Sequence, residues 1–378
     1  MNKLLLERRA FLLALISLDG VGSQTVFKIL KFCQKRQLTI TEFWGNKYNA
    51  WQEINLKEKT IESIKNFKKE HNLIDNLLKL ETSGIEMITF EESNYPPLLL
   101  AIDDLPAVIF VKSHVKVGSE AWWNALSNTI SVVGTRRMTS YGELVINRIV
   151  PPLVSAGKVI TSGFMYGVDL TAARVALLNK GQTIAVLGFG FDHCFPSSQK
   201  KIMQEFLDNG AIFLSEFIPQ TLARASNFVI RNRIVAGLSK VTIVIEAAKR
   251  SGSHITASYA NNYGRLVMAV PGPITNPFSD GTKELINQGA ILINSAADVL
   301  IEIEDDYHVS AFDSVKKSDT SSSEVKLLLE NLSFYPEISF ESLQKNTQIP
   351  SDLLNQLLFD LELKGRIIKK WGKYCLVS

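Results

Sequence analysis

The fold is decided by residues 129–137, Thr-Ile-Ser-Val-Val-Gly-Thr-Arg-Arg, a short apolar run that ends in a turn of glycine, threonine and arginine. Six similar apolar runs follow, with helical stretches between nearly all of them. They cover residues 159–161, 183–187, 211–214, 241–245, 266–270 and 291–293. Continuous apolar strands that alternate with helices predict a doubly wound α/β domain, in which helices cover both faces of a parallel sheet.

The chain of 378 residues, 46% of them apolar, is long enough for two or three domains. Residues 1–88 are predicted to be a small helical domain, because helical periodicity is broken by a Leu-Asp-Gly-Val-Gly turn at residues 18–22. Helix, glycine turn and helix are typical of a sterile-alpha-motif (SAM) or helix-hairpin-helix module, and a plain helical hairpin fits this pattern equally well.

The α/β domain is expected to span residues 89–303, with an acidic and then Ser/Asp/Lys-rich linker over residues 304–322. Residues 323–378 form a separate predicted unit of three helices followed by two short strands. That order of elements is typical of a winged helix, a relative of the helix-turn-helix. The predicted recognition helix, residues 351–363, is mostly apolar and carries three acids, which favours protein docking over base readout.

Charge and cysteine content exclude several classes of protein. The net charge of +3 rules out a uniformly basic coat, so an anion-binding surface must be local. The three cysteines are scattered and lack zinc or redox spacing, which predicts a cytoplasmic protein without a metal site. No run of about 18 apolar residues occurs, so no membrane span is expected.

The candidate binding residues lie where the predicted strands end. Open parallel sheets bind ligands beyond the carboxyl ends of their strands, at the point where the strand order reverses. Four turns there combine glycine or hydroxyl residues with a helix start, and backbone amides in such turns hold phosphate. The turns are residues 134–137, 161–169, 188–190 and 246–253.

The dinucleotide fingerprint of Rossmann-like domains is absent, because no further glycines follow Gly134 in register. No Walker sequence occurs either. We therefore expect neither a nicotinamide cofactor nor any other cofactor in this crevice.

Residues 227–238 place Arg231 and Arg233 at the start of an otherwise apolar helix, with Arg224 just upstream. Two arginines in that position could bind phosphate bidentately, or they could form structural ion pairs with acids of the domain. The neighbouring Ser251-Gly252-Ser253 turn favours phosphate binding.

These motifs, in this order, resemble those of the DNA-processing protein A (DprA/Smf) family. The resemblance rests on the turn at 134–136, the segment 162–169, the Arg-Asn-Arg segment within 227–238, and the segments 250–257 and 270–272. It implies a cytoplasmic, non-catalytic protein that binds single-stranded DNA, protects it and loads the recombinase RecA during natural transformation. It also implies a homodimer, for which Leu285, Ile286 and Ile291 are candidate contacts, although ordinary core packing explains these residues equally well.

Motifs and resemblance together define the predicted DNA-binding site. Its residues are Gly134, Thr135, Arg136, Arg137, Ser162, Gly163, Arg224, Asn227, Arg231, Arg233, Arg250, Ser251, Gly252, Ser253 and Thr256. The chain departs from the family at Gln182, where lysine is common, and at the bulky segment 164–166. An aromatic ring in that segment could stack on a base or pack against the sheet.

The alternative is an enzyme that acts on nucleotides, because the predicted fold is similar to that of phosphoribohydrolases. The Pro-Gly-Gly signature of those enzymes is absent here. Glu246 and Asp169 are the carboxylates near the crevice, and either could act as an acid or a base, or instead cap a helix or pair with an arginine.

Overall fold

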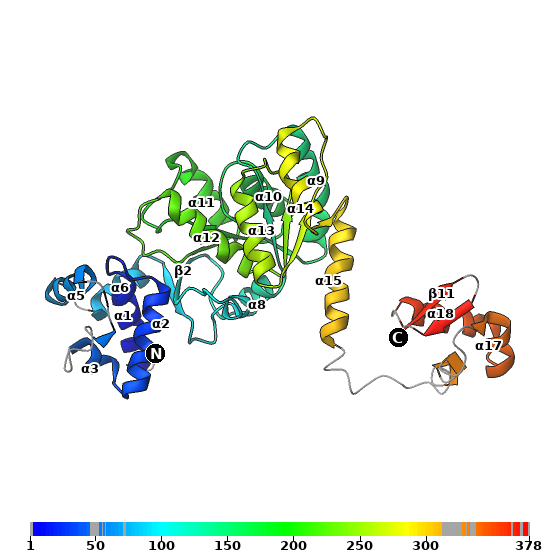
Figure 1. Cartoon of the computed structure of the whole chain (residues 1–378), viewed down its shortest axis with the longest axis horizontal. Helices are drawn as coiled ribbons and strands as arrows, with labels where there is room; N and C mark the ends of the chain where they lie inside the picture. The colour runs from blue at the N-terminus through cyan, green and yellow to red at the C-terminus, as the bar shows by residue number, and fades with distance from the viewer. Residues whose placement is uncertain are drawn as a thin grey trace. The chain divides into compact units, whose positions relative to one another are not determined.

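The computed structural model describes residues 3–45, 53–54, 56, 58–70, 73–311, 327–329, 331–332, 338–363, 366–370 and 373–376. The chain divides into two compact units, Met1–Glu304 and Asp305–Ser378. The first unit contains the sheet and the helices around it, and the second has its own small sheet (Figure 1).

The first unit is built on a nine-stranded, mostly parallel sheet in the order β1-β2-β6-β5-β4-β3-β7-β8-β9. All seven strands predicted from residue 129 onward are present, and they pair in parallel. Two strands, β1 and β2, extend the sheet with antiparallel pairing. The strands are β1 (Glu86–Thr89), β2 (Val108–Lys112), β3 (Thr129–Val133), β4 (Val159–Ser162), β5 (Thr183–Leu187), β6 (Ile212–Ser215), β7 (Val241–Val244), β8 (Leu266–Ala269) and β9 (Ile291–Leu292).

Helices cover both faces of this sheet, as the apolar strands predict. The larger ones are α8 (Glu120–Ser127), α9 (Ser140–Ser155), α10 (Val168–Leu178), α11 (Lys200–Asp208), α12 (Ala225–Gly237), α13 (Gly252–Asn262), α14 (Asp280–Asn287) and α15 (Ala296–Ala311). Ile130 and Val132 of β3 share a buried cluster with α9 and α10, whereas Val133 shares one with α12 and α13. Alternate residues of one strand thus face opposite layers, which makes the domain doubly wound.

The helices of the N-terminal segment pack onto the sheet. They are α1 (Lys3–Ile16), α2 (Ser23–Arg36), α3 (Ile40–Gly45), α5 (Glu58–Glu70) and α6 (Leu73–Thr82). Phe11 and Phe43 belong to the same buried cluster as Phe110 of β2 and Phe213 of β6. The predicted boundary at residue 88 therefore crosses a continuous apolar core, and the existence of a separate domain over residues 1–88 stays a prediction.

The second unit contains α17 (Phe340–Thr347), α18 (Ser351–Leu363) and a three-stranded antiparallel sheet. Its strands follow the order β10 (Ile338–Ser339), β12 (Lys373–Leu376), β11 (Ile367–Lys370), so one short strand joins the two that the sequence predicts. Leu343, Leu354 and Tyr374 lie in a core of their own.

The predicted linker, residues 304–322, begins one residue before the second compact unit, and its extent stays a prediction. Helix α15 continues to Ala311, so the first eight residues of the interval 304–322 are helical, and residues 312–322 lie outside the described residues. Among the helices that the structure describes, none combines the length and the apolar character that crossing a membrane requires.

The two adjacent tryptophans of α8 give a test of this packing. Trp122 is completely buried and its indole Nε1 donates to the carbonyl of Asn94 at 3.1 Å, while Trp123 is only half-buried. We expect Trp122→Ala to lower the free energy of unfolding by about 3–5 kcal/mol, since it leaves a large cavity. Trp123→Ala should cost clearly less in the same urea titration, and equal losses for the two variants would contradict this packing.

Candidate nucleic-acid interface

A cavity of about 460 Å³ opens at the carboxyl ends of the central strands. It lies where β3 has β4 on one side and β7 on the other, which is the reversal point of the strand order. Nine of the predicted site residues line it: Gly134, Arg136, Gly163, Arg224, Arg231, Ser251, Gly252, Ser253 and Thr256.

The turn after β3 is held close to its neighbours by backbone contacts. Thr135 N donates to the carbonyl of Glu246 at 2.7 Å, and Thr135 Oγ1 accepts from Arg137 N at 3.1 Å. A Cβ atom on Gly134 would lie 2.6 Å from Val168 Cγ2, so glycine is needed at this position. The turn leaves the side chain of Arg136 exposed at the cavity, whereas that of Thr135 is buried.

Arg231 forms the floor of the cavity, where it is 2% exposed. Its Nη1 donates to the carbonyl of Gly163, the residue after β4, at 2.5 Å. It also donates to the carbonyl of Val186, the second-last residue of β5. Burial lowers the pKa of the guanidinium to about 10, which leaves it cationic at neutral pH. A fixed positive charge thus sits at the edge of the sheet.

Asp169, in the first turn of α10, brings a carboxyl group to the same place. Its Oδ2 accepts from Gly163 N at 3.2 Å. Burial raises its pKa to about 6, although the nearby Arg231 and Arg136 lower it. The cavity therefore has one acid among its arginines.

The amino end of α13 forms another wall. Ser251 caps this helix of 11 residues, and its Oγ accepts from Ser253 N at 3.3 Å. A Cβ on Gly252 would meet no atom within 4 Å, so the backbone there is open to a ligand. The positive end of the helix dipole favours an anion at this position.

Aromatic rings flank the arginines. The guanidinium carbon of Arg136 lies 5.6 Å from the ring centroid of Phe228, and that of Arg231 lies 5.8 Å from it. The ring of Phe195 packs against that of Phe228, with 5.6 Å between the ring centroids. Phe195 is 44% exposed and lines the cavity. Sequence reasoning missed Phe195, although its place in the loop after β5 was the available signal.

The two aromatic residues of segment 164–166 lie in different environments, one buried against the sheet and one exposed. Phe164 is buried against Phe206 and Phe213. Tyr166 is 43% exposed and its hydroxyl contacts that of Ser198 at 2.7 Å. Only Tyr166 of these two is therefore accessible to a base.

The other predicted site residues lie outside the cavity lining. Ser162 Oγ donates to the carbonyl of Val132 at 2.7 Å, and Asn227 Nδ2 donates to that of Leu222 at 3.3 Å, so both residues support the turns. Arg137 and Arg250 are exposed, and each is adjacent in sequence to a residue of the lining, Arg136 and Ser251.

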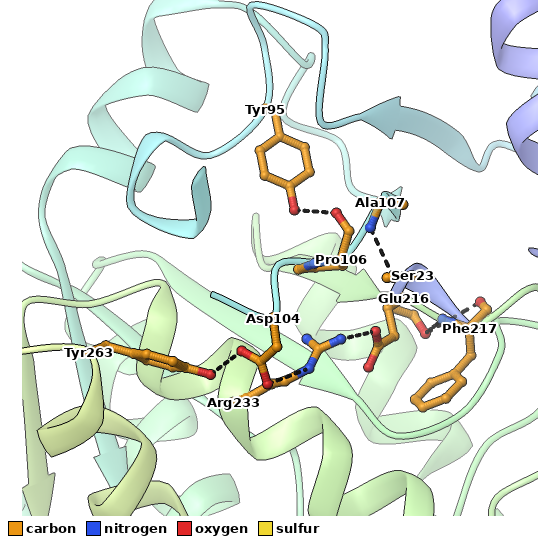
Figure 2. Close-up of polar contacts among 10 residues, drawn as sticks. Ser23, Tyr95, Asp104, Pro106, Ala107, Glu216, Phe217, Arg233 and Tyr263 are labelled. Carbon is orange, nitrogen blue, oxygen red and sulfur yellow. Dashed lines mark hydrogen bonds and ion pairs between the residues drawn. The ribbon is translucent and has the colours of Figure 1, made fainter. Parts of the chain in front are cut away.

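Arg233 does not face the cavity, contrary to the expectation for the arginine pair. Its guanidinium pairs with Glu216, and its Nε lies 3.5 Å from Asp104 Oδ2. Figure 2 shows Asp104 between Arg233 and the hydroxyl of Tyr263. Burial raises the pKa of Glu216, and Arg233 opposes that shift. The contacts of Arg233 with Glu216 and Asp104 link α12 to the end of β6 and to the loop before β2.

The N-terminal glycine turn also lies away from the cavity. Residues 18–23 line a separate hollow together with Glu216 and Arg233. Ser23 Oγ accepts from Ala107 N at 3.0 Å, as Figure 2 shows.

Glu246 has a structural role. It is 1% exposed, and its carboxylate accepts from Thr139 N at 2.9 Å, Thr139 Oγ1 at 2.6 Å and Asn276 Nδ2 at 3.3 Å. These bonds hold the residue that caps α9. In the part of the chain that the structure describes, no group of three His, Cys, Asp or Glu residues is placed to hold a metal ion.

The candidate dimer residues lie together at the far edge of the sheet. Leu285 and Ile291 line a hollow of about 520 Å³, and Ile286 packs beside them against the core. Leu285 is buried, whereas Ile286 and Ile291 are half-buried.

Fold and cavity together define a doubly wound α/β protein with an arginine-lined crevice at a topological switch point. The family model described as DNA recombination-mediator protein A matches residues 86–304, more than half of the chain. The chain belongs to this family, which confirms the resemblance found in its motifs.

Curated relatives carry the two names used for the family. The chain is 39% identical over 234 residues to Protein Smf of Escherichia coli K12, which covers 62% of the chain and 60% of that relative. It is 37% identical over 220 residues to the DNA processing protein DprA of Bacillus subtilis 168, or 58% of the chain and 72% of the relative. The match thus spans three fifths of the E. coli protein's own length.

Solved structures have the same fold. DprA from Streptococcus pneumoniae superposes with a TM-score of 0.66 at 30% identity, covering 78% of this chain and 97% of that one. DprA from Helicobacter pylori, whose structure is described in terms of its single-stranded DNA binding mode, gives 0.50 at 29% identity, covering 58% and 97%.

The buried ion pair predicts a stability effect separate from binding. Arg233→Ala leaves Glu216 and Asp104 without their partner, so we expect the free energy of unfolding to fall by about 3–5 kcal/mol. Arg8→Ala removes the exposed pair with Glu91 and should cost at most about 1 kcal/mol. Similar losses for the two variants in urea denaturation would show that Arg233 is not a structural link.

Proposed function

We propose that the protein binds single-stranded DNA without catalysing a reaction, with the sugar-phosphate backbone in the cavity at the switch point. The observation that carries this proposal is the convergence on one cavity of exposed Arg136, buried Arg231 and the amino end of α13. Among the described residues, no carboxylate lies within 4.0 Å of the guanidinium of Arg136 or Arg224. Both guanidinium groups are therefore available to phosphate.

The aromatic rim supports a single strand as the ligand. Phe195 is an exposed ring in the cavity lining, and Tyr166 is an exposed ring that follows the lining residue Met165 in sequence. Unpaired bases stack on such rings whatever their identity. In a duplex the bases stack on one another and offer no free face. We exclude Arg233 from the proposed contacts, because its charge is already balanced by two carboxylates.

Family membership supports a wider role. We propose that the protein protects incoming single strands in the cytoplasm and loads RecA on them during natural transformation. We also propose a homodimer through the edge that carries Leu285, Ile286 and Ile291. The small helices and three-stranded sheet after residue 338 support a winged helix used for protein docking.

The order of the N-terminal helices is compatible with a SAM or helix-hairpin-helix module. The surroundings of their glycine turn, however, support a plain helical hairpin. The turn lines a hollow beside Glu216, which disfavours a phosphate there.

The nucleotide-processing alternative has weaker support. The carboxylate of Glu246 holds Thr139, the cap of α9, and Asp169, the acid in the cavity, accepts a hydrogen bond from Gly163 N, so both candidate carboxylates have structural partners. Incubation with nucleoside monophosphates, followed by an assay for free base, tests this alternative, and we expect no release.

Replacing Arg136 tests the proposed interface. Arg136→Ala should weaken binding to all single-stranded sequences alike, measured by fluorescence anisotropy with labelled oligonucleotides. The slope of log K against log salt should become shallower by about 0.7, because one phosphate contact is lost. Arg148→Ala, an exposed arginine of α9 outside the cavity, is the matched control. An affinity and a slope unchanged by Arg136→Ala would refute the assignment.

A further inference from the structure

The acid in the cavity is unexpected in a site for phosphate. Asp169 is 9% exposed and lines the cavity with Arg136 and Arg231. A Cβ atom built on Gly163 would lie 2.6 Å from both Asp169 Oδ2 and Arg231 Nη2, so these two side chains flank the same backbone position. A ligand that reaches Arg231 therefore comes close to the carboxyl group of Asp169.

A phosphate and an ionised carboxylate cannot share a buried site without strong repulsion. Like charges brought together in a low-dielectric site raise the pKa of one of them until it binds a proton. A phosphodiester is a very weak base, so the proton goes to the carboxyl group. The protonated carboxyl then has an O–H donor, which the ionised form lacks.

The surroundings make this protonation easy. Burial already raises the pKa of Asp169 to about 6. The charged groups that face it are Arg231 of α12 and Arg136 of the turn after β3, and both favour the ionised form. A strand whose phosphates neutralise these arginines removes that opposing effect.

We propose that Asp169 takes up one proton when a single strand binds and donates it in a hydrogen bond to a phosphate oxygen. This rests on the proposed function, and it makes DNA binding depend on pH. Asp169 is thus a ligand contact as well as the acceptor for Gly163 N.

The direction of the pH dependence follows from the linkage between proton uptake and DNA binding. Below pH 6 the free protein already carries the proton, so affinity is independent of pH. Above pH 6 the proton must be taken from solvent, and affinity falls toward tenfold for each pH unit. We expect binding to be about tenfold weaker at pH 7.5 than at pH 6.0.

The test is anisotropy with full-length protein and a labelled oligothymidylate, whose bases do not titrate between pH 5.5 and 8.0, at constant ionic strength. Asp169→Asn is uncharged and keeps an N–H donor. It should bind with no pH dependence and about thirtyfold more tightly than the native protein at pH 7.5. Asp192→Asn removes an exposed acid outside this cavity and should keep the native profile.

A purely structural role for Asp169 gives the opposite result: Asp169→Asn would bind more weakly, with the native pH slope intact, and the proposal would be wrong. If this variant does not fold, calorimetry of the native protein at pH 7 in two buffers of different ionisation enthalpy decides. Uptake of close to one proton per bound strand supports the proposal, and no uptake overturns it. Absence of binding at every pH would instead refute the proposed function itself.

Discussion

The cavity depends on one buried cation. Arg231 is held by the carbonyl groups of Gly163 and Val186, at the carboxyl ends of two neighbouring strands. These bonds fix the middle of α12 (Ala225–Gly237) against the sheet edge and require glycine at position 163, where a Cβ would collide with the guanidinium. Its hydrogen bonds to these carbonyls leave its charge uncompensated, and Asp169 is the acid that faces it in the cavity.

Helix α12 has two functional faces. Arg231 faces the cavity, while Arg233 pairs with Glu216 and Asp104 on the other side and ties the loop before β2 to the domain. Ser23 at the start of α2 bonds to Ala107 in the same region. The proposed ligand contact and the structural ion pair thus use arginines two residues apart, so a substitution can change one and leave the other in place.

The sequence predicts much of this arrangement, because apolar strands that end in glycine turns must bring those turns to one edge of a parallel sheet. It does not separate Arg231 from Arg233 unless helix geometry is applied, since residues two apart point about 200° away from each other. Arg231 bonds to Gly163 and Val186, whereas Arg233 pairs with Glu216 and Asp104, and all four partners are distant from the arginines in sequence. Phe195 was missed for a similar reason: it reaches the cavity through contact with Phe228, which only the fold reveals. The helical extension of α15 into the predicted linker shows that an acidic composition alone does not mark the end of a helix.

The central claim is that a single strand lies in this cavity. Photocrosslinking with oligonucleotides that carry 5-iododeoxyuridine, followed by mass spectrometry of the peptides, measures which side chains contact the bases. We expect adducts on Phe195, an exposed ring in the cavity lining, and on Tyr166, an exposed ring that follows the lining residue Met165 in sequence. Adducts confined to the unit after residue 304, with none around the cavity, would contradict the account.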